Sequence, residues 1–175
     1  MKAVVVYESM FGNTHAVAEA IGKGLGESVA TVVPAADASP ELLAGADLVV
    51  VGGPTHVHGM SRQSTRRAAV DMAAKPDATV VLEPPPARSG VREWLAAQPG
   101  AGGARAAAFD TRLHWPAAIG GKASRGIARQ LRHHGYRMES GPESFYVSKE
   151  NRLLAGEEAR AEAWGRRLAA TARAA

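Results

Sequence analysis

The chain of 175 residues contains no cysteine. This absence excludes disulfide bonds, iron–sulfur clusters and thiol catalysis, and with them the phosphate loop of cysteine-dependent phosphatases. The sequence also lacks an apolar run of 18 residues, which argues against a membrane span. The first expected strand begins at Ala3, which leaves no room for a signal peptide. We therefore expect a cytoplasmic protein.

Two familiar phosphate-binding motifs are missing as well. The chain has no Gly-x4-Gly-Lys-Ser/Thr sequence, which a Walker loop requires. A dinucleotide-binding fingerprint requires Gly-x-Gly-x-x-Gly directly after a strand. Gly22, Gly24 and Gly26 are the nearest approximation, but they fall at the far end of an expected helix, and we interpret them as its fraying C-terminus.

Positive charge is concentrated in the second half of the chain. The formal net charge is +4, yet residues 1–87 contain 6 Lys and Arg against 9 Asp and Glu, and residues 88–175 contain 15 against 8. Composition alone does not make the chain a nucleic-acid binder, and no nucleic-acid partner is expected. Its length and a hydrophobic content of 46% predict a single globular domain spanning residues 1–175.

The stretch from Val4 to Thr14 is the most informative part of the chain. The β-branched run Val4–Val6 predicts a strand buried on both faces. A polar turn follows, and a helical pattern begins near Asn13. Loop N–H groups and the helix dipole at such a junction attract an anion. No Lys or Arg lies between Glu8 and His15, so dipoles and hydroxyl groups must hold a phosphate that stays in place.

The remaining pattern alternates strands and helices. Further strands are expected at residues 29–33, 46–51 (ending at Gly52-Gly53-Pro54), 105–109 and 136–147, the last broken near Gly141-Pro142. Helices are expected at residues 40–43, 62–74, 91–97, 122–134 and 157–172. The Pro-rich stretch at about residues 75–90 is interpreted as a surface insertion. The alternation predicts an α/β fold, a parallel sheet with helices on both faces.

Three segments resemble the flavodoxin family, whose members bind flavin mononucleotide (FMN). Residues 7–14, Tyr-Glu-Ser-Met-Phe-Gly-Asn-Thr, resemble the phosphate loop of that family. Residues 52–61 and residues 109–112 stand where flavodoxins carry their first and second ring-binding loops. The resemblance implies a flavodoxin-like three-layer αβα sandwich with a five-stranded parallel sheet in the order 2-1-3-4-5. In that order all three loops follow neighbouring strand ends and meet at one cleft.

The resemblance also implies a set of FMN-binding residues. In the phosphate loop they are Ser9, Met10, Phe11, Gly12, Asn13 and Thr14. In the first ring loop they are Pro54, Thr55, His56, Val57, His58 and Gly59. In the second they are Phe109, Asp110, Thr111, Arg112 and Trp115. Gly12 would allow the tight turn, and Gly59 is the candidate for the peptide flip that flavodoxins use on reduction. Trp94 and Trp164 are assigned to helix packing.

Some of these residues have a simpler interpretation. His56 and His58 have the His-x-His spacing of a metal site, but no acidic or cysteine ligand lies nearby in the sequence, and no metal is expected. Contact with the flavin ring or plain surface exposure is the alternative. Asp110 and Thr111 could bond the pyrimidine edge of the ring, whereas Arg112 could be an ordinary exposed residue.

The chain departs from the well-studied flavodoxins, which are acidic and often stack Trp and Tyr on the ring. Here no aromatic residue lies in the first ring loop, and the second half of the chain is basic. Lys122, Arg125, Arg129 and Arg132 recur at helical spacing and form one stripe. The stripe is either a solvated helix face or a docking surface for an acidic redox partner protein.

The resemblance implies a flavodoxin-type electron carrier, with no catalytic residue of its own. Two alternatives stay open. One is an oxidoreductase of the same fold acting on a quinone or a porphyrinogen, although no residue triad identifies such a substrate. The other is an interaction module that has lost the cofactor, against which the intact Ser-x-x-Gly-Asn-Thr loop argues.

Overall fold

The computed structural model describes residues 1–26, 30–83, 89–101, 103–116 and 120–174. The strands are β1 (Ala3–Tyr7), β2 (Ala30–Pro34), β3 (Leu48–His56), β4 (Gly59–Met60), β5 (Arg105–Leu113), β6 (Arg137–Met138) and β7 (Glu143–Val147). The helices are α1 (Asn13–Leu25), α2 (Pro40–Leu43), α3 (Gln63–Ala73), α4 (Val91–Ala97), α6 (Ala123–His133) and α7 (Glu157–Ala174). Val29, where the second strand was expected to begin, lies outside the described residues.

The strands form one sheet that is parallel except at β4. Neighbouring strands follow the order β2-β1-β3-β5-β6, with β7 also paired to β5 and β4 paired antiparallel to β3. The main path matches the predicted order 2-1-3-4-5, with β5 as its fourth strand, but the sheet has seven strands and not five, because β4 and β7 pair beside this path. The fifth strand is divided into β6 and β7 on either side of Gly141-Pro142, where a break was predicted.

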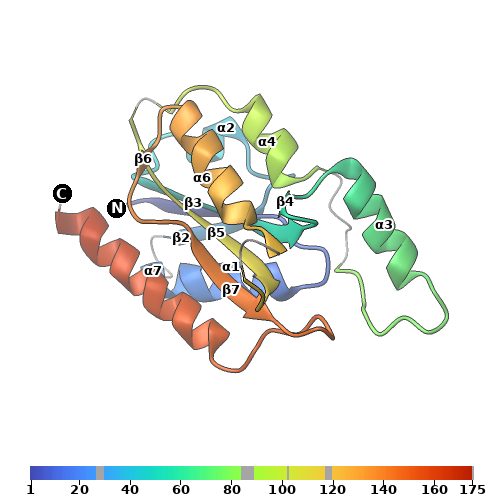
Figure 1. The fold of residues 1–175 in the computed structure, drawn as a ribbon. Helices are drawn as coiled ribbons and strands as arrows, with labels where there is room; N and C mark the ends of the chain where they lie inside the picture. The colour runs from blue at the N-terminus through green and yellow to red at the C-terminus, as the bar shows by residue number, and fades with distance from the viewer. Residues whose placement is uncertain (27–29, 84–88, 102, 117–119, 175) are drawn as a thin grey trace.

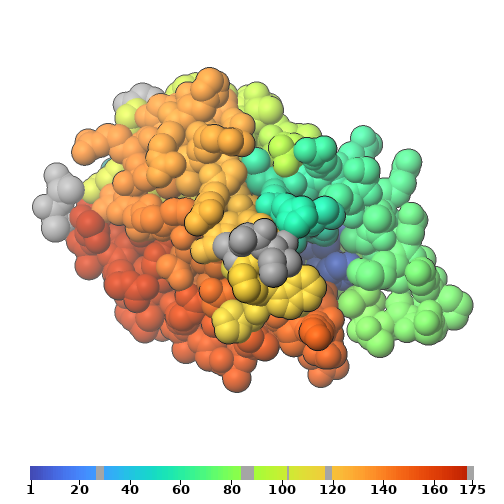
Figure 2. Space-filling model, viewed as in Figure 1, coloured from blue at the N-terminus to red at the C-terminus, as the bar shows by residue number. Residues whose placement is uncertain are grey.

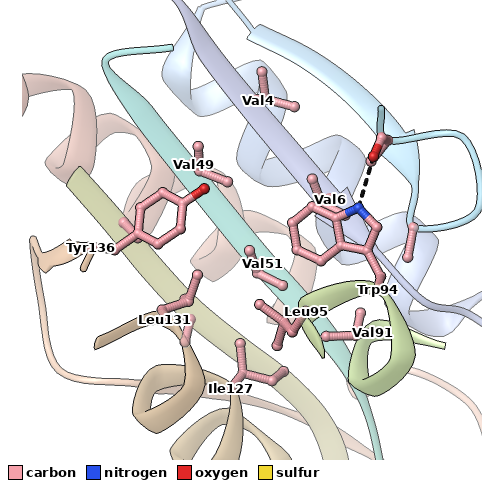
Figure 3. Packing of buried hydrophobic residues seen from close by; sticks show 14 of the residues in the cluster. Val4, Val6, Val49, Val51, Val91, Trp94, Leu95, Ile127, Leu131 and Tyr136 are labelled. Carbon is pink, nitrogen blue, oxygen red and sulfur yellow. Dashed lines mark hydrogen bonds between the residues drawn. The ribbon is translucent and has the colours of Figure 1, made fainter. Parts of the chain in front are cut away.

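Helices cover both faces of the sheet (Figure 1). Ala3 and Val5 of β1 point to the face covered by α1 and α7, whereas Val4 and Val6 point to the face covered by α4 and α6. Figure 3 shows the second face, where Trp94 packs above the strands and its Nε1 donates to the Ala38 carbonyl at 2.8 Å. The predicted three-layer sandwich, and the packing roles of Trp94 and Trp164, are confirmed.

Helices α1 and α7 approach each other closely because each carries a glycine at the contact. A Cβ on Gly24 would overlap the Glu162 carbonyl oxygen, and one on Gly165 would overlap the Ile21 carbonyl oxygen. The glycines near residue 24 do form the C-terminus of α1, with Gly26 as its C-cap, but this end is packed against α7 and not frayed.

Two strands run further than the sequence indicated, and both extensions lie at the candidate site. Gly52, Gly53 and Pro54 pair with residues 109–111 of β5 and continue β3 as far as His56. The strand can continue through Pro54 because β1 has already ended at Tyr7. No neighbouring strand on that side needs the N–H that a proline lacks. β5 likewise continues to Leu113 because it pairs with β7.

Helix α3 projects from the edge of the molecule, and its buried side chains are those of Arg66 and Ala69 (Figure 1). The chain then returns through residues 75–83, which contain no strand, while Pro84–Pro86 of the expected insertion lie outside the described residues. At the end of this return the Glu83 N–H donates to the Met10 carbonyl at 2.8 Å. The stretch thus reaches the expected phosphate loop.

Candidate functional site

The loops that follow β1, β3 and β5 meet at one end of the sheet. The Glu8 N–H donates to the Gly52 carbonyl at 3.0 Å, which joins the first loop to the second. The hydroxyl groups of Thr14, in the first turn of α1, and Thr111, near the end of β5, lie 2.7 Å apart, which joins the end of the expected phosphate loop to the expected second ring loop. In Figure 2 the blue N-terminal segment forms the floor of a recess between the teal β3–β4 segment and the yellow segment after β5.

Gly12 shapes the loop that leads into α1. Its φ of 85° is in the left-handed region, and its N–H donates to the Ser9 hydroxyl at 3.1 Å. A Cβ on Gly12 would meet no atom within 4 Å, so this position faces open space. The N–H groups of Asn13, Thr14 and His15 belong to the first helical turn and have no acceptor in the part of the chain that the structure describes. Together they offer a phosphate-sized anion a set of unpaired donors.

The polar side chains of this loop bond to other parts of the protein. The Asn13 amide donates to the Asn151 carbonyl at 2.9 Å, and its oxygen accepts from the Leu153 N–H at 3.1 Å. Thr14 bonds Thr111, and the Ser9 hydroxyl accepts from Gly12. Met10 is buried and Phe11 is half-buried. Backbone N–H groups, more than side-chain groups, are therefore free to hold an anion.

Glu83 places a carboxylate beside the same loop. It bonds Nδ1 of His15, whose ring stacks on Tyr7 with centroids 4.6 Å apart. Burial, followed by the nearby Glu83 carboxylate, raises the pKa of Tyr7 to about 12. Sequence reasoning missed Glu83, because no pattern links the end of a Pro-rich stretch to a loop 70 residues earlier.

The first ring loop is a β-hairpin with a two-residue turn. Thr55 pairs with Met60 and His56 with Gly59, which leaves Val57 and His58 at the tip with φ of 53° and 134°. Such angles are unfavourable for residues other than glycine, and most of all for a β-branched residue such as valine. Gly59, the candidate for a peptide flip, lies in β4 beyond this turn. Val57 is 76% exposed, so the strained tip faces solvent.

The start of α6 holds this hairpin in place. The Ala123 N–H donates to the Thr55 hydroxyl at 2.9 Å. Gly121, with φ of 67°, lies against the backbone of His58 so closely that a Cβ there would overlap it. The segment before α6 thus holds the hairpin in place, and this close contact requires a glycine at position 121.

In the expected second ring loop, which forms the end of β5, the first two predicted site residues are buried within the protein. The Phe109 ring is fully buried, edge-on to Phe145 and Trp164 at 6.2 and 6.4 Å. Asp110 is also fully buried, and its Oδ2 accepts from the Ser124 N–H at 2.8 Å. These side chains support the loop and the start of α6, and they do not face the recess.

The next part of this loop lines a small cavity. Arg112 is 5% exposed and not the surface residue that one interpretation expected, and it donates to the Trp115 carbonyl. Its Nε is buried without a partner among the described residues. A cavity of about 180 Å³ lies between Arg112 and Trp115 on one side and Thr55, Val57 and His58 of the hairpin on the other. The two expected ring loops therefore face each other across this space.

A buried polar cluster lies behind the hairpin, and sequence reasoning missed it. The Glu8 carboxylate accepts from the Val91 N–H at 2.9 Å, and Arg66 donates to the Ser61 hydroxyl at 2.8 Å. Arg66 also pairs with Glu93 at 3.1 Å. Burial lowers the pKa of the neighbouring His56, while Glu8 opposes and Arg66 adds to that effect. A carboxylate directly after a buried strand, as at Glu8, is the one sequence signal for this cluster.

Among the residues described, no three His, Cys, Asp or Glu side chains are grouped so that they could hold a metal ion. Within the same residues, no helix combines the length and the apolar character needed to cross a bilayer.

Comparison with known proteins gives a consistent result. A family profile described as flavodoxin matches residues 5–92. A flavodoxin from the domain Archaea is 22% identical with a TM-score of 0.67, over 99% of both chains. A WrbA-like flavodoxin from Agrobacterium tumefaciens is 23% identical over 99% of this chain and 98% of that one, with a TM-score of 0.61. A Cys-to-Ser mutant of the Pseudomonas aeruginosa flavodoxin is 18% identical over 99% of both chains, with a TM-score of 0.62. No curated protein matched the sequence.

Proposed function

We propose, on the premise that this chain belongs to the flavodoxin family, that it binds FMN and carries electrons to a partner protein. The observation that supports this most strongly is the hydrogen bond between Thr14 and Thr111, because it brings the phosphate loop and the second ring loop to the same place. The open face of Gly12 and the unpaired N–H groups of the first turn of α1 suit a phosphate group.

The residues that would hold FMN follow from the geometry of the loops. The N–H groups of Asn13, Thr14 and His15 would bind the phosphate. The hairpin tip and Trp115 would enclose the ring between them, and Arg112 lines the same cavity. Bound FMN would supply the redox chemistry, while the chain sets its orientation and its electrostatic surroundings.

A partner protein would dock near the hairpin. Arg125, Arg129 and Arg132 of the basic stripe are exposed, and α6 packs beside the hairpin tip (Figure 1). Positive charge there would steer an acidic protein surface towards the ring and raise the rate of association at low salt.

The test of cofactor binding is direct. The purified protein should be yellow and should release FMN on denaturation. Gly12→Ala should weaken FMN binding about tenfold, because a Cβ is unfavourable at its φ and narrows the anion site. Gly45→Ala is the matched control, since Gly45 also has a positive φ and open surroundings but lies away from the site. A colourless protein that fails to bind added FMN, or equal FMN affinity in both variants, would overturn the proposal.

A further inference from the structure

A second hollow, of about 500 Å³, lies on the other side of the β3–β4 hairpin. Its lining includes Arg92 of α4 and Lys122, Arg125 and Arg129 at and along α6, and residues 58–60 of the hairpin form one wall. The lining contains no acidic side chain. None of these four cations forms an ion pair with any residue that the structure describes.

Arg92 is held in a fixed orientation at this hollow. Its Nε donates to the Ser61 carbonyl at 3.0 Å and its Nη2 to the Met60 carbonyl at 2.9 Å. A guanidinium group has five N–H donors, so three are left for a ligand. Because the side chain is already fixed by these two bonds, binding an anion there costs little conformational entropy.

Three of the residues between the cations are glycines, which add no side chain to the wall of the hollow. A Cβ on Gly59 would meet no atom within 4 Å, so this part of β4 faces open space. Gly121 lies before α6 and against the hairpin, and Gly126 lies in the first turn of that helix. An anionic group can therefore enter between positive charges that belong to two different helices.

We infer that this hollow binds a small organic molecule through a phosphate or pyrophosphate group. Its volume falls within the range of small-molecule sites, about 300–1,000 Å³. Arginine donors on two sides match the oxygens of a phosphate group. Three of the four stripe cations line the hollow together with Arg92 of the other helix, whereas Arg132 lies on α6 beyond it. A convex acidic partner would require no such concavity.

The inference goes beyond electron transfer to a protein and does not depend on FMN. The hairpin separates the hollow from the cavity between the two ring loops, and His58 lines both. A phosphorylated molecule held by Arg92 and Arg125 would extend beside the same hairpin that borders the proposed ring site. It would also compete with an acidic partner protein for Arg125 and Arg129.

The experiment titrates the purified protein, as isolated, with inorganic pyrophosphate at about 0.15 M salt. Calorimetry gives the affinity, and amide NMR shifts identify the site. The amide signals of Gly59, Gly121 and Gly126 should move. Arg125→Gln, which removes an exposed side chain without bonds to the rest of the described protein, should weaken binding about tenfold. Arg132→Gln is the matched control and should change the affinity by less than about twofold.

Three results would overturn the inference. In the first, pyrophosphate moves only the amides of residues 10–15, which places the anion in the phosphate loop and leaves the proposed FMN site intact. In the second, Arg125→Gln and Arg132→Gln weaken binding equally, as non-specific attraction requires. In the third, a poly-glutamate peptide moves the Gly59 and Gly121 amides while pyrophosphate does not, which assigns the hollow to an acidic protein partner.

Discussion

The hydroxyl oxygens of Thr14 and Thr111 lie 2.7 Å apart in the protein interior, although 97 residues separate them in the sequence. Thr14 stands in the first turn of α1, and Thr111 is paired with Pro54 near the end of β5. One buried hydrogen bond therefore links the start of α1, the proposed phosphate site, to the segments that enclose the small cavity.

Thr111→Val keeps the shape of the side chain and removes this bond. We expect the free energy of unfolding to fall by about 1–3 kcal/mol, because the Thr14 hydroxyl is left buried without a partner. FMN affinity should fall as well, since the first turn of α1 loses its support. Thr31→Val, at an exposed position of β2, is the control and should change stability by less than about 0.5 kcal/mol. Urea unfolding curves measure both, and equal curves would show that the bond contributes nothing.

Gly90 is surrounded by the buried polar cluster. A Cβ there would overlap Nη1 of Arg66 and would lie 2.6 Å from Oε2 of Glu8 and 2.9 Å from the Ser61 hydroxyl. Gly90→Ala should lower the free energy of unfolding by about 1–3 kcal/mol, because the cluster must separate to admit the methyl group. Gly100→Ala is the control, as its nearest contact would be at 3.9 Å. Equal changes in both variants would show that the cluster is not responsible, because the lower entropy of the unfolded chain raises the stability of both alike.

His56 should make the stability depend on pH below neutrality. Burial lowers the pKa of this imidazole from its ordinary value of 6.5. As the pH falls below about 6.5, the unfolded chain therefore binds a proton more readily than the folded protein does, and stability decreases. Unfolding free energies measured between about pH 7.5 and 5.5 should fall less steeply in His56→Gln than in the wild type. Parallel slopes would mean that His56 titrates alike in both states.

The order of elements could be predicted because it depends on patterns that are local in the sequence. The run Val4–Val6 is β-branched throughout, and a strand covered on both faces needs such residues. Ala123, Ile127 and Leu131 recur at helical spacing, and in the structure all three are buried beneath the exposed basic stripe. The break at Gly141-Pro142 was predictable for the same reason, because a proline cannot continue the pairing.

The side-chain partners at the site could not be predicted in this way. Asn13 bonds to Asn151 and Leu153, and the position of these residues depends on how the end of β7 folds back. The lengths of β3 and β5 depend on pairing with each other, which outweighs the local preference of Gly52, Gly53 and Pro54 for a turn. A family resemblance assigns residues to loops, but only the packed structure decides which of their polar atoms remain free.

Arg112 should raise the redox potential of FMN held at the proposed site. Its buried guanidinium group lines the cavity between the two ring loops, and it is positively charged at any accessible pH. A unit charge about 10 Å from the ring, at an effective dielectric constant of about 40, contributes roughly 0.8 kcal/mol. That energy corresponds to roughly 35 mV for one electron. The sign is positive because reduction adds negative charge to the flavin, which a nearby cation stabilises.

Arg112→Gln should therefore lower the midpoint potential by roughly 35 mV in an anaerobic redox titration. Arg112→Lys keeps the charge and should restore most of the wild-type value, which separates electrostatics from any shift of the Trp115 loop. Arg132→Gln removes a charge from the exposed, far end of α6 and should have a smaller effect, because water and salt screen it. If Arg112→Gln binds FMN with an unchanged potential, the guanidinium group is too distant from the ring or too well screened to act on it.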